Sequence, residues 1–329
     1  MSIRGRTSSK EKMAYQHPQS GILSYLPQFW VPYAELARIE RPAGYLYAFW
    51  PCTWSTMIAA SLRLDSISAG EILNKLLLWA VFCILVRSAG CVCNDIWDRD
   101  IDPHVERTRF RPLARNAVTV HNAMIFGATL LLCGLTVMTQ LLEVPYWYYF
   151  PLATFVILYG GAKRVTYYPQ VILGLTMGSG AILGFPATGV DLFSDSIALS
   201  EAIHMVLFTV GWQVIVDMIY AHVDVHDDRK IGVKSMAVIH SGKAVLVVMI
   251  ALQALSIIMI GIFWQATLSF FIWTAGLVLL CSGSMVYCVN LNDPKSCMWW
   301  FKGNSWHVGL VTFCGFVGQY VVKRYTGVK

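Results

Sequence analysis

Apolar residues in this chain gather into blocks of roughly 17–22 residues, and short polar stretches separate one block from the next. A helix of this length crosses the hydrocarbon core of a bilayer. Of the 329 residues, 56% are hydrophobic and 13% are charged, whereas soluble domains contain about 25% charged residues. The sequence therefore predicts an all-α polytopic membrane protein in a lipid bilayer. It excludes soluble globular, collagen-like and disulfide-linked secreted folds.

The blocks predict nine transmembrane helices, at about 43–61, 72–92, 121–142, 146–161, 171–189, 203–219, 245–265, 268–289 and 307–322. Lysine and arginine are concentrated before the first span and in alternate loops. The segment 95–116 alone contains Arg99, Arg107, Arg109, Arg111 and Arg115. By the positive-inside rule these loops face the cytoplasm or its topological equivalent. The net charge of +6 is thus a topology signal, and no nucleic-acid partner is expected.

Two parts of the chain differ in character. Residues 1–37 form a polar N-terminal segment, and residues 38–329 are expected to form one transmembrane domain. The N-terminal segment lacks the continuous apolar region of a secretory signal peptide, while a mitochondrial transit peptide remains open. Most of the nine cysteines lie inside apolar blocks without zinc-site spacing, which indicates small core residues.

A strongly acidic segment follows the second predicted span. Asn94, Asp98 and Asp102 are spaced so that each step along a helix turns by only about 40°. If the helix continues through this segment, the three side chains form one stripe on its surface. The spacing therefore predicts a group of oxygen atoms at the membrane boundary.

A second acidic segment ends the sixth predicted span. Relative to Asp217, a continuing helix would place Asp224 at about 340° and Asp228 at about 20°, so the three share a face. The orientation of the spans puts both acidic segments on the same side of the membrane. Clustered carboxylates are costly at a membrane boundary unless a cation neutralises them.

Oxygen ligands of this kind suit Mg²⁺, which binds through a few carboxylates, waters and substrate phosphates. The two segments therefore indicate a site for a phosphate-bearing ligand held through Mg²⁺. Basic residues on the same side can contact phosphate directly, namely Arg107, Arg109, Arg111, Lys163 and Arg164. Either segment alone is equally compatible with a solvated loop or a capping network, but two on one side favour a ligand site.

Both segments resemble the signature motifs of the UbiA superfamily of intramembrane prenyltransferases. The matching residues are Asn94-Asp95-x-x-Asp98-x-x-x-Asp102 and Asp217-x-x-Tyr220-x-x-x-Asp224-x-x-x-Asp228. Three stretches are similar to the 4-hydroxybenzoate polyprenyltransferase branch: Arg38-x-x-Arg41-Pro42-x-Gly44, Arg87-Ser88-Ala89-Gly90 and Lys163-Arg164-x-Thr166. The stretch Tyr159-Gly160-Gly161-Ala162 lacks the proline usual after the tyrosine in ubiquinone enzymes. This difference favours the fungal relatives that prenylate aromatic polyketides.

The resemblance implies nine transmembrane helices around a central cavity and an aromatic prenyltransferase activity. The expected reaction moves a farnesyl group from a prenyl diphosphate donor to a ring carbon of a phenolic acid acceptor in meroterpenoid biosynthesis. The alternative is 4-hydroxybenzoate polyprenyl transfer in ubiquinone biosynthesis. A secondary transporter is the alternative of another class, because intramembrane Asp and Arg residues also mark ion pathways. The endoplasmic reticulum, with the site facing the cytosol, is the expected location, and the mitochondrial inner membrane is the alternative.

The resemblance also implies residue roles. One Mg²⁺ is assigned to Asn94, Asp98 and Asp102 and the other to Asp224 and Asp228, with Asp95 as a further ligand or a supporting group. Lys163 is expected to clamp the diphosphate, with further donor contacts from Arg107, Arg111 and Arg164. Asp217 is the candidate proton acceptor or the group that activates a phenol. Arg38 is expected to hold an acceptor carboxylate, and Arg87 and Tyr220 complete the substrate-binding set.

Overall fold

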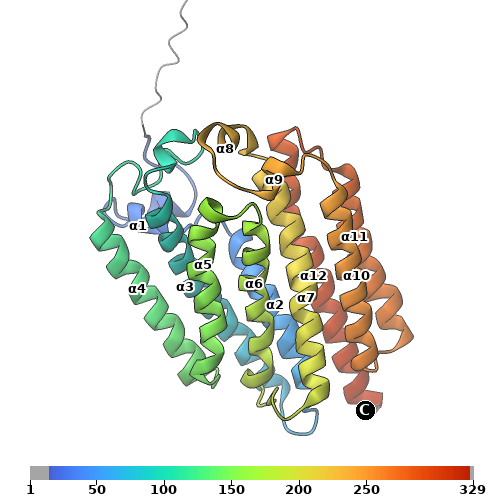
Figure 1. Cartoon of the computed structure of the whole chain (residues 1–329). Coiled ribbons are helices and arrows are strands. Elements are labelled where there is room, and N and C mark those ends of the chain that lie inside the picture. The colour runs from blue at the N-terminus through green and yellow to red at the C-terminus, as the bar shows by residue number, and fades with distance from the viewer. Residues whose placement is uncertain (1–14, 327–329) are drawn as a thin grey trace, which may run out of the picture.

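The chain forms a bundle of long helices in a computed structural model, which describes residues 15–326 apart from the side chain of Lys163 (Figure 1). Every regular element within this range is helical. The long helices are α2 (Ala43–Ser61), α3 (Ala69–Asp98), α4 (Val120–Thr136), α5 (Tyr149–Val165), α6 (Pro169–Ala187), α7 (Ser196–Ala221), α10 (Ala244–Phe263), α11 (Gly276–Cys288) and α12 (Pro294–Thr326). The short ones are η1 (Ile22–Tyr25), α1 (Val31–Leu36), η2 (Asp102–His104), η3 (Val137–Leu141), η4 (Tyr146–Tyr148), α8 (Val225–Ile231), α9 (Met236–Ile239) and η5 (Phe270–Ala275).

Each predicted span coincides with one of the long helices. In the described part of the chain, six helices are long and apolar enough to cross a membrane: Ala69–Asp98, Val120–Leu141, Pro169–Ala187, Ser196–Ala221, Ala244–Phe263 and Phe270–Cys288. Large apolar side chains such as Leu77, Leu132 and Leu280 are exposed on these helices, which is typical of a surface that meets lipid. The predicted all-α polytopic membrane fold is confirmed.

The helix α12 begins well before its predicted start at residue 307. Asp293 caps the helix by accepting a hydrogen bond from the Lys295 amide at 3.0 Å, and Pro294 suits the first helical turn. Because this first part carries Lys295 and Lys302, a search for apolar blocks does not find it. The predicted boundary was therefore wrong.

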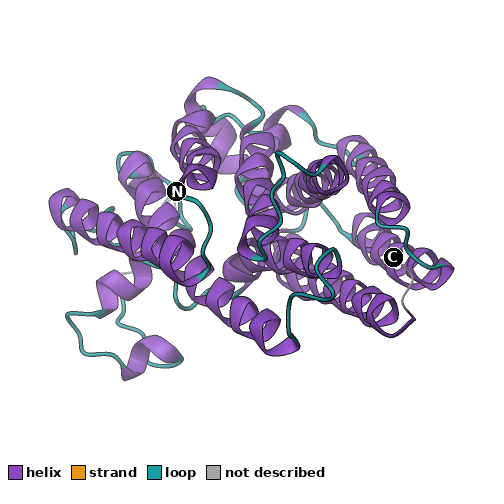
Figure 2. Cartoon of the chain, turned by 90° about the horizontal axis from the view of Figure 1, so that it is seen from below, coloured by secondary structure: helices purple, strands orange, loops and turns teal. Residues whose placement is uncertain are grey.

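The helix α2 lies inside the bundle, where it packs against α3, α6, α7 and α12 (Figure 2 shows the packing along the helix axes). The indole nitrogens of Trp50 and Trp54 donate hydrogen bonds to the carbonyls of Ser305 and Gly309, at 2.7 and 3.1 Å. A Cβ atom on Gly309 would lie 2.1 Å from the Trp50 ring nitrogen. Only glycine at this position lets α12 approach α2 so closely.

The short elements α1, α8 and α9 lie together at one end of the bundle, and the C-terminus lies at the other end (Figure 1). The loop that follows α3 lies at the same end as α8. Both acidic segments therefore come to one end of the molecule, as the predicted orientation of the spans requires.

Candidate active site

A cavity of about 1080 Å³ opens at this end of the bundle, larger than the roughly 300–1,000 Å³ of ordinary ligand pockets. Its wall includes the cationic residues Arg38, Arg41, Arg87, Arg107 and Arg111. Deeper wall residues are apolar and come from α3, α5 and α6, namely Phe82, Val86, Leu152, Val156, Leu173 and Met177. A cavity with charged groups near its mouth and apolar side chains below suits an amphiphilic ligand with an anionic head.

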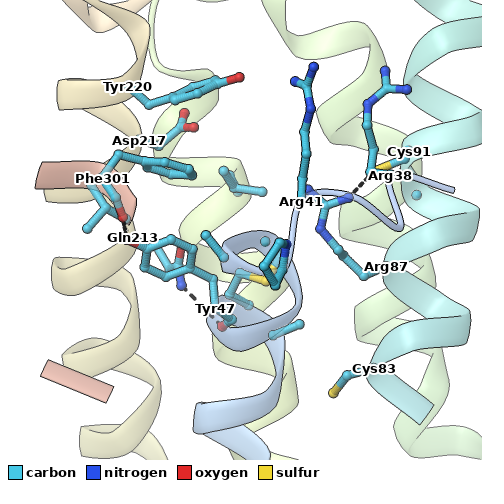
Figure 3. Close-up of a pocket in the computed structure, with 18 of the residues that line it drawn as sticks. Arg38, Arg41, Tyr47, Cys83, Arg87, Cys91, Gln213, Asp217, Tyr220 and Phe301 are labelled. Carbon is cyan, nitrogen blue, oxygen red and sulfur yellow. Dashed lines mark hydrogen bonds between the residues drawn. The ribbon is translucent and has the colours of Figure 1, made fainter. Parts of the chain in front are cut away.

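Aromatic side chains form one wall of the cavity beside Asp217. The rings of Tyr220 and Phe301 lie 4.6 Å apart, and those of Phe301 and Tyr47 lie 5.2 Å apart. The Tyr47 hydroxyl donates a hydrogen bond to the Phe301 carbonyl at 2.6 Å, and Gln213 donates one to the Tyr47 carbonyl at 3.3 Å. Asp217 and Tyr220 project from α7 toward Arg41 and Arg87 on the other side of the cavity (Figure 3).

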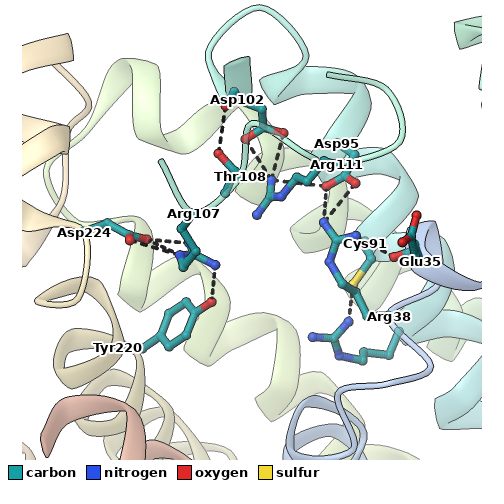
Figure 4. A network of polar contacts seen from close by, with 11 residues as sticks. Glu35, Arg38, Cys91, Asp95, Asp102, Arg107, Thr108, Arg111, Tyr220 and Asp224 are labelled. Carbon is teal, nitrogen blue, oxygen red and sulfur yellow. Dashed lines mark hydrogen bonds and ion pairs between the residues drawn. The ribbon is translucent and has the colours of Figure 1, made fainter. Parts of the chain in front are cut away.

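We call Asn94–Asp102 the first acidic arm. Asp95, whose side chain is 1% exposed, forms a two-pronged ion pair with Arg38 at 2.6 and 2.9 Å. Arg111 contacts Asp95 at 3.2 Å and both carboxylate oxygens of Asp102, at 3.0 and 2.9 Å (Figure 4). Burial raises the pKa of Asp102, although Arg111 opposes the shift. Asp95 and Asp102 are thus buried and neutralised by guanidinium groups, whereas Asp100 in the same arm is exposed.

We call Asp217–Asp228 the second acidic arm. Arg107, from the loop that follows the first arm, bonds both carboxylate oxygens of Asp224 through its Nε and Nη2 atoms, at 2.5–3.0 Å. Its Nη1 atom donates to the Tyr220 hydroxyl at 2.7 Å. Burial would lower the pKa of Arg107, but Tyr220 and Asp224 raise it, so the guanidinium stays charged. One arginine therefore joins the two arms, and the predicted convergence of the two segments is confirmed (Figure 4).

The predicted acidic stripes are helical only in part. Asn94 and Asp98 share the last turn of α3, but the expectation that one helix continues to Asp102, and another from Asp217 to Asp228, was wrong. The helix α3 ends at Asp98, and Asp102 opens the separate turn η2, where Pro103 follows it. The helix α7 ends at Ala221, and Asp224 directly precedes α8. Chain turns, and not the helical period, bring these carboxylates to the bundle end.

Three other predicted site residues differ in where they lie. Arg87 lines the cavity and lies over the Tyr45 ring at 5.4 Å, with a further contact to the Cys91 sulfur. Arg164 donates instead to the Trp97 carbonyl at the end of α3, away from the cavity wall. Lys163 lies in α5, but its side chain is outside the part that the structure describes.

The cavity residues that were not predicted as site residues include Arg41, Tyr47, Gln213 and Phe301. Arg41 is part of the Arg38-x-x-Arg41-Pro42 motif, which is the signal that could have identified it. Phe301 belongs to the first part of α12, which the predicted boundary had placed in a loop. Tyr47 and Gln213 lie on the buried faces of α2 and α7, where sequence gives no sign of a cavity.

The donor set of the two arms is made of amide and carboxylate oxygens, which fits Mg²⁺. Within residues 15–326 no three Asp, Glu, His or Cys side chains gather closely enough to hold a metal ion. Arginine guanidinium groups form ion pairs with Asp95, Asp102 and Asp224. The chemistry of the site therefore suits Mg²⁺, while arginines provide the positive charge in this structure.

The chain is similar to known proteins of one family, both in sequence and in fold. The UbiA prenyltransferase family matches residues 48–308. The mitochondrial 4-hydroxybenzoate polyprenyltransferase of Schizosaccharomyces pombe is 40% identical over 301 residues, which cover 90% of this chain and 82% of that protein. A UbiA homolog from Aeropyrum pernix K1 matches with a TM-score of 0.65 and 20% identity, over 82% of this chain and 97% of that chain. A UbiA homolog from Archaeoglobus fulgidus bound to GPP and Mg²⁺ matches with a TM-score of 0.60 and 16% identity, over 87% and 99% of the two chains.

Proposed function

The chain belongs to the UbiA prenyltransferase family and is an aromatic prenyltransferase, and we propose that it transfers a polyprenyl group to a ring carbon of 4-hydroxybenzoate. The observation that carries this proposal is the cavity, in which arginines and Asp217 stand above an apolar wall and next to both acidic arms. The name of the S. pombe relative supports 4-hydroxybenzoate as the acceptor.

The expected farnesyl transfer to a polyketide-derived acid has less support. It depends on Tyr159-Gly160-Gly161-Ala162, in which glycine replaces a proline. A Cβ atom on Gly160 would lie 2.5 Å from the ring of Trp97, so a larger residue at this position would collide with α3. The packing of α5 against α3 is thus enough to explain the glycine, which is weak support for a different acceptor.

The diphosphate of the donor is proposed to lie between the two acidic arms. Mg²⁺ held by Asn94, Asp98 and Asp102 on one arm and by Asp224 and Asp228 on the other would neutralise the charge that develops on the leaving diphosphate. Arg107 and Arg111 line the cavity next to the two arms and can contact phosphate oxygens directly. Lys163 is proposed as a further diphosphate clamp.

The reaction breaks the bond between C1 of the prenyl chain and the diphosphate oxygen. The acceptor ring carbon forms a new bond to C1, and the ring proton leaves for the carboxylate of Asp217. The faces of Tyr220, Phe301 and Tyr47 beside Asp217 exclude water and stabilise positive charge on the prenyl group.

The acceptor carboxylate is proposed to bind Arg41 and Arg87. Both line the cavity, and the Arg41 side chain is 51% exposed, with an ion pair to its neighbour Glu40 at 3.2 Å. Arg38, predicted for this role from sequence, is engaged by the buried Asp95. We therefore assign Arg38 to positioning the first arm.

All nine long helices of the described chain are proposed to cross the membrane, three of them with polar or aromatic faces turned into the bundle. An odd number of crossings fits the position of the C-terminus at the end opposite α8 (Figure 1). The mitochondrial inner membrane is the proposed location, because the S. pombe relative is named as mitochondrial. In this proposal residues 38–329 form the transmembrane domain.

Purified protein in nanodiscs would be incubated with Mg²⁺, prenyl diphosphates of increasing length and either 4-hydroxybenzoate or a polyketide-type resorcylic acid. Mass spectrometry should find ring-prenylated 4-hydroxybenzoate, and chelation of Mg²⁺ with EDTA should abolish it. Transfer to the resorcylic acid alone would replace the proposed acceptor, and transfer in EDTA would remove the metal.

A further inference from the structure

Arg107 forms a two-pronged ion pair with Asp224, which is a proposed metal ligand. Its planar fork meets both carboxylate oxygens, and its remaining Nη1 atom bonds Tyr220. The side chains of Arg107 and Asp224 are 25% and 14% exposed. A carboxylate has about four lone-pair positions, and a two-pronged guanidinium takes one on each oxygen, so a metal ion that binds both oxygens on that side would have to displace it.

Arg111 neutralises carboxylates of the first arm, through one nitrogen atom and not through a fork. A single Nη1 atom contacts both oxygens of Asp102 and one oxygen of Asp95. These two carboxylates are nearly inaccessible, with side-chain exposures of 5% and 1%. The second arm therefore already holds one guanidinium, that of Arg107, and the first arm holds two, those of Arg111 and Arg38. A divalent cation at either arm would add two more positive charges.

Mg²⁺ alone is a poor ligand for such a site, because it would have to displace a guanidinium that then has no anionic partner. A diphosphate alone is also a poor ligand, because it would have to draw the arginines away from buried carboxylates, which would then lack a cationic partner. When both arrive together, the arginines can pass to phosphate oxygens, to which guanidinium binds as well as to carboxylates. The carboxylates are then free for the metal, and no charge is left unpaired.

We propose that Arg107 makes Mg²⁺ binding depend on the diphosphate, so that the site accepts the two as one magnesium–diphosphate complex. Arg111 has the same part on the first arm. This inference rests on the proposed function for the position of the metal and the diphosphate. It makes Arg107 a positioning residue. Its removal should strengthen the binding of metal alone and reduce the coupling between metal and diphosphate.

The test measures binding, with neither prenyl chain nor acceptor present. Protein in nanodiscs would be titrated with Mg²⁺ by calorimetry, and with Mn²⁺ by electron paramagnetic resonance, with or without inorganic diphosphate. Free metal concentrations would be matched between the two series. In the wild type, diphosphate should raise metal affinity at least about 10-fold, within the usual range of coupling between sites. Metal affinity that is the same with and without diphosphate would overturn the proposal without the need for any variant.

Arg107→Gln should bind metal alone about 10-fold more tightly than the wild type and should lose most of the enhancement by diphosphate. The matched control is Arg115→Gln, which removes the same charge from the same loop. Arg115 pairs with Glu35 and lies over the Tyr15 ring, and among the described residues no ion pair joins it to a carboxylate of either arm, so this variant should bind metal as the wild type does. Unchanged or weaker metal binding by folded Arg107→Gln, or equal effects of the two variants, would contradict the proposal.

The proposal and the proposed function fail in different ways. A protein that prenylates 4-hydroxybenzoate but binds Mg²⁺ equally well with and without diphosphate keeps its function and loses this coupling. A protein that shows the coupling but transfers no prenyl group to any phenolic acid keeps the magnesium–diphosphate site and loses the proposed reaction.

Discussion

The two acidic arms use the same kinds of residue but are held in different ways. In the first arm, Asp95 and Asp102 are at most 5% exposed and are neutralised by Arg38 and Arg111. In the second arm, Asp224 is 14% exposed, and Asp227 on the short helix α8 is 36% exposed and pairs with Lys230 at 3.8 Å. The first arm is therefore part of the packed protein, whereas the second is held to it through Arg107. Changes in the first arm should cost both stability and activity, and changes in the second mainly activity.

The largest effect is expected where a carboxylate that holds metal is removed. Asp98→Asn and Asp224→Asn should each lower the rate of prenyl transfer about 1,000-fold, which corresponds to several kcal/mol of lost charge stabilisation. Asp227→Asn, in the same arm but outside the proposed ligand set, is the matched control and should stay within a few-fold of wild type. Initial rates measured with saturating donor check this, and full activity in Asp224→Asn would remove the second arm from the metal site.

The next effect concerns the proton acceptor, which belongs to the second arm but lies deeper in the cavity. Asp217→Asn should lower kcat about 100-fold and leave donor binding unchanged, because an amide cannot take the ring proton. The measurement is steady-state kinetics with donor and acceptor varied separately. A large rise in the KM of the donor with kcat intact would instead place Asp217 among the diphosphate or metal contacts.

A smaller effect is expected on stability, and it should differ between the two arms. Arg38→Ala leaves the buried Asp95 with Arg111 as its remaining ion-pair partner, and we expect a loss of roughly 2 kcal/mol in the free energy of unfolding. Arg107→Ala removes a pair that is partly exposed and should cost about 1 kcal/mol or less. Thermal unfolding in detergent compares the stability of the two variants. Equal losses of stability would contradict the claim that the first arm is packed more firmly than the second.

The smallest effect concerns Glu35 in the short helix α1. Glu35 accepts a hydrogen bond from the Tyr15 hydroxyl at 2.8 Å and pairs with Arg115 at 2.5 Å. Glu35→Gln should lower stability by about 1 kcal/mol and leave transfer kinetics unchanged, because these contacts lie outside the cavity wall. An altered acceptor KM in this variant would show that the segment shapes the site.

Local signals in the sequence predicted the spans well, because hydropathy is a property of consecutive residues. The predicted bounds 43–61 agree with α2 at both ends. The same signal missed the start of α12, since lysines interrupt its apolar pattern, and with it Phe301 of the cavity wall.

The acidic motifs also identified the right region, but their internal geometry could not be read from spacing. Arg38 and Asp95 are 57 residues apart in the chain, and Arg107 and Asp224 are 117 apart. Such pairs arise only when helices pack, so no periodicity reveals that arginines hold the carboxylates. For the same reason, sequence alone predicted an acceptor contact for Arg38 where the fold provides a buried ion pair.

The central claim is that both arms act on one donor complex, and a double-variant cycle tests it most directly. Transfer rates would be compared for wild type, Asp98→Asn, Asp224→Asn and the double variant, with unfolding temperatures measured to confirm that each protein is folded. If the arms hold a single magnesium–diphosphate complex, the double variant should be about as slow as the slower single variant, since residues that act as a unit are not additive. Losses that multiply, so that the folded double variant is about a million-fold slower than wild type, would show two independent sites and contradict the account.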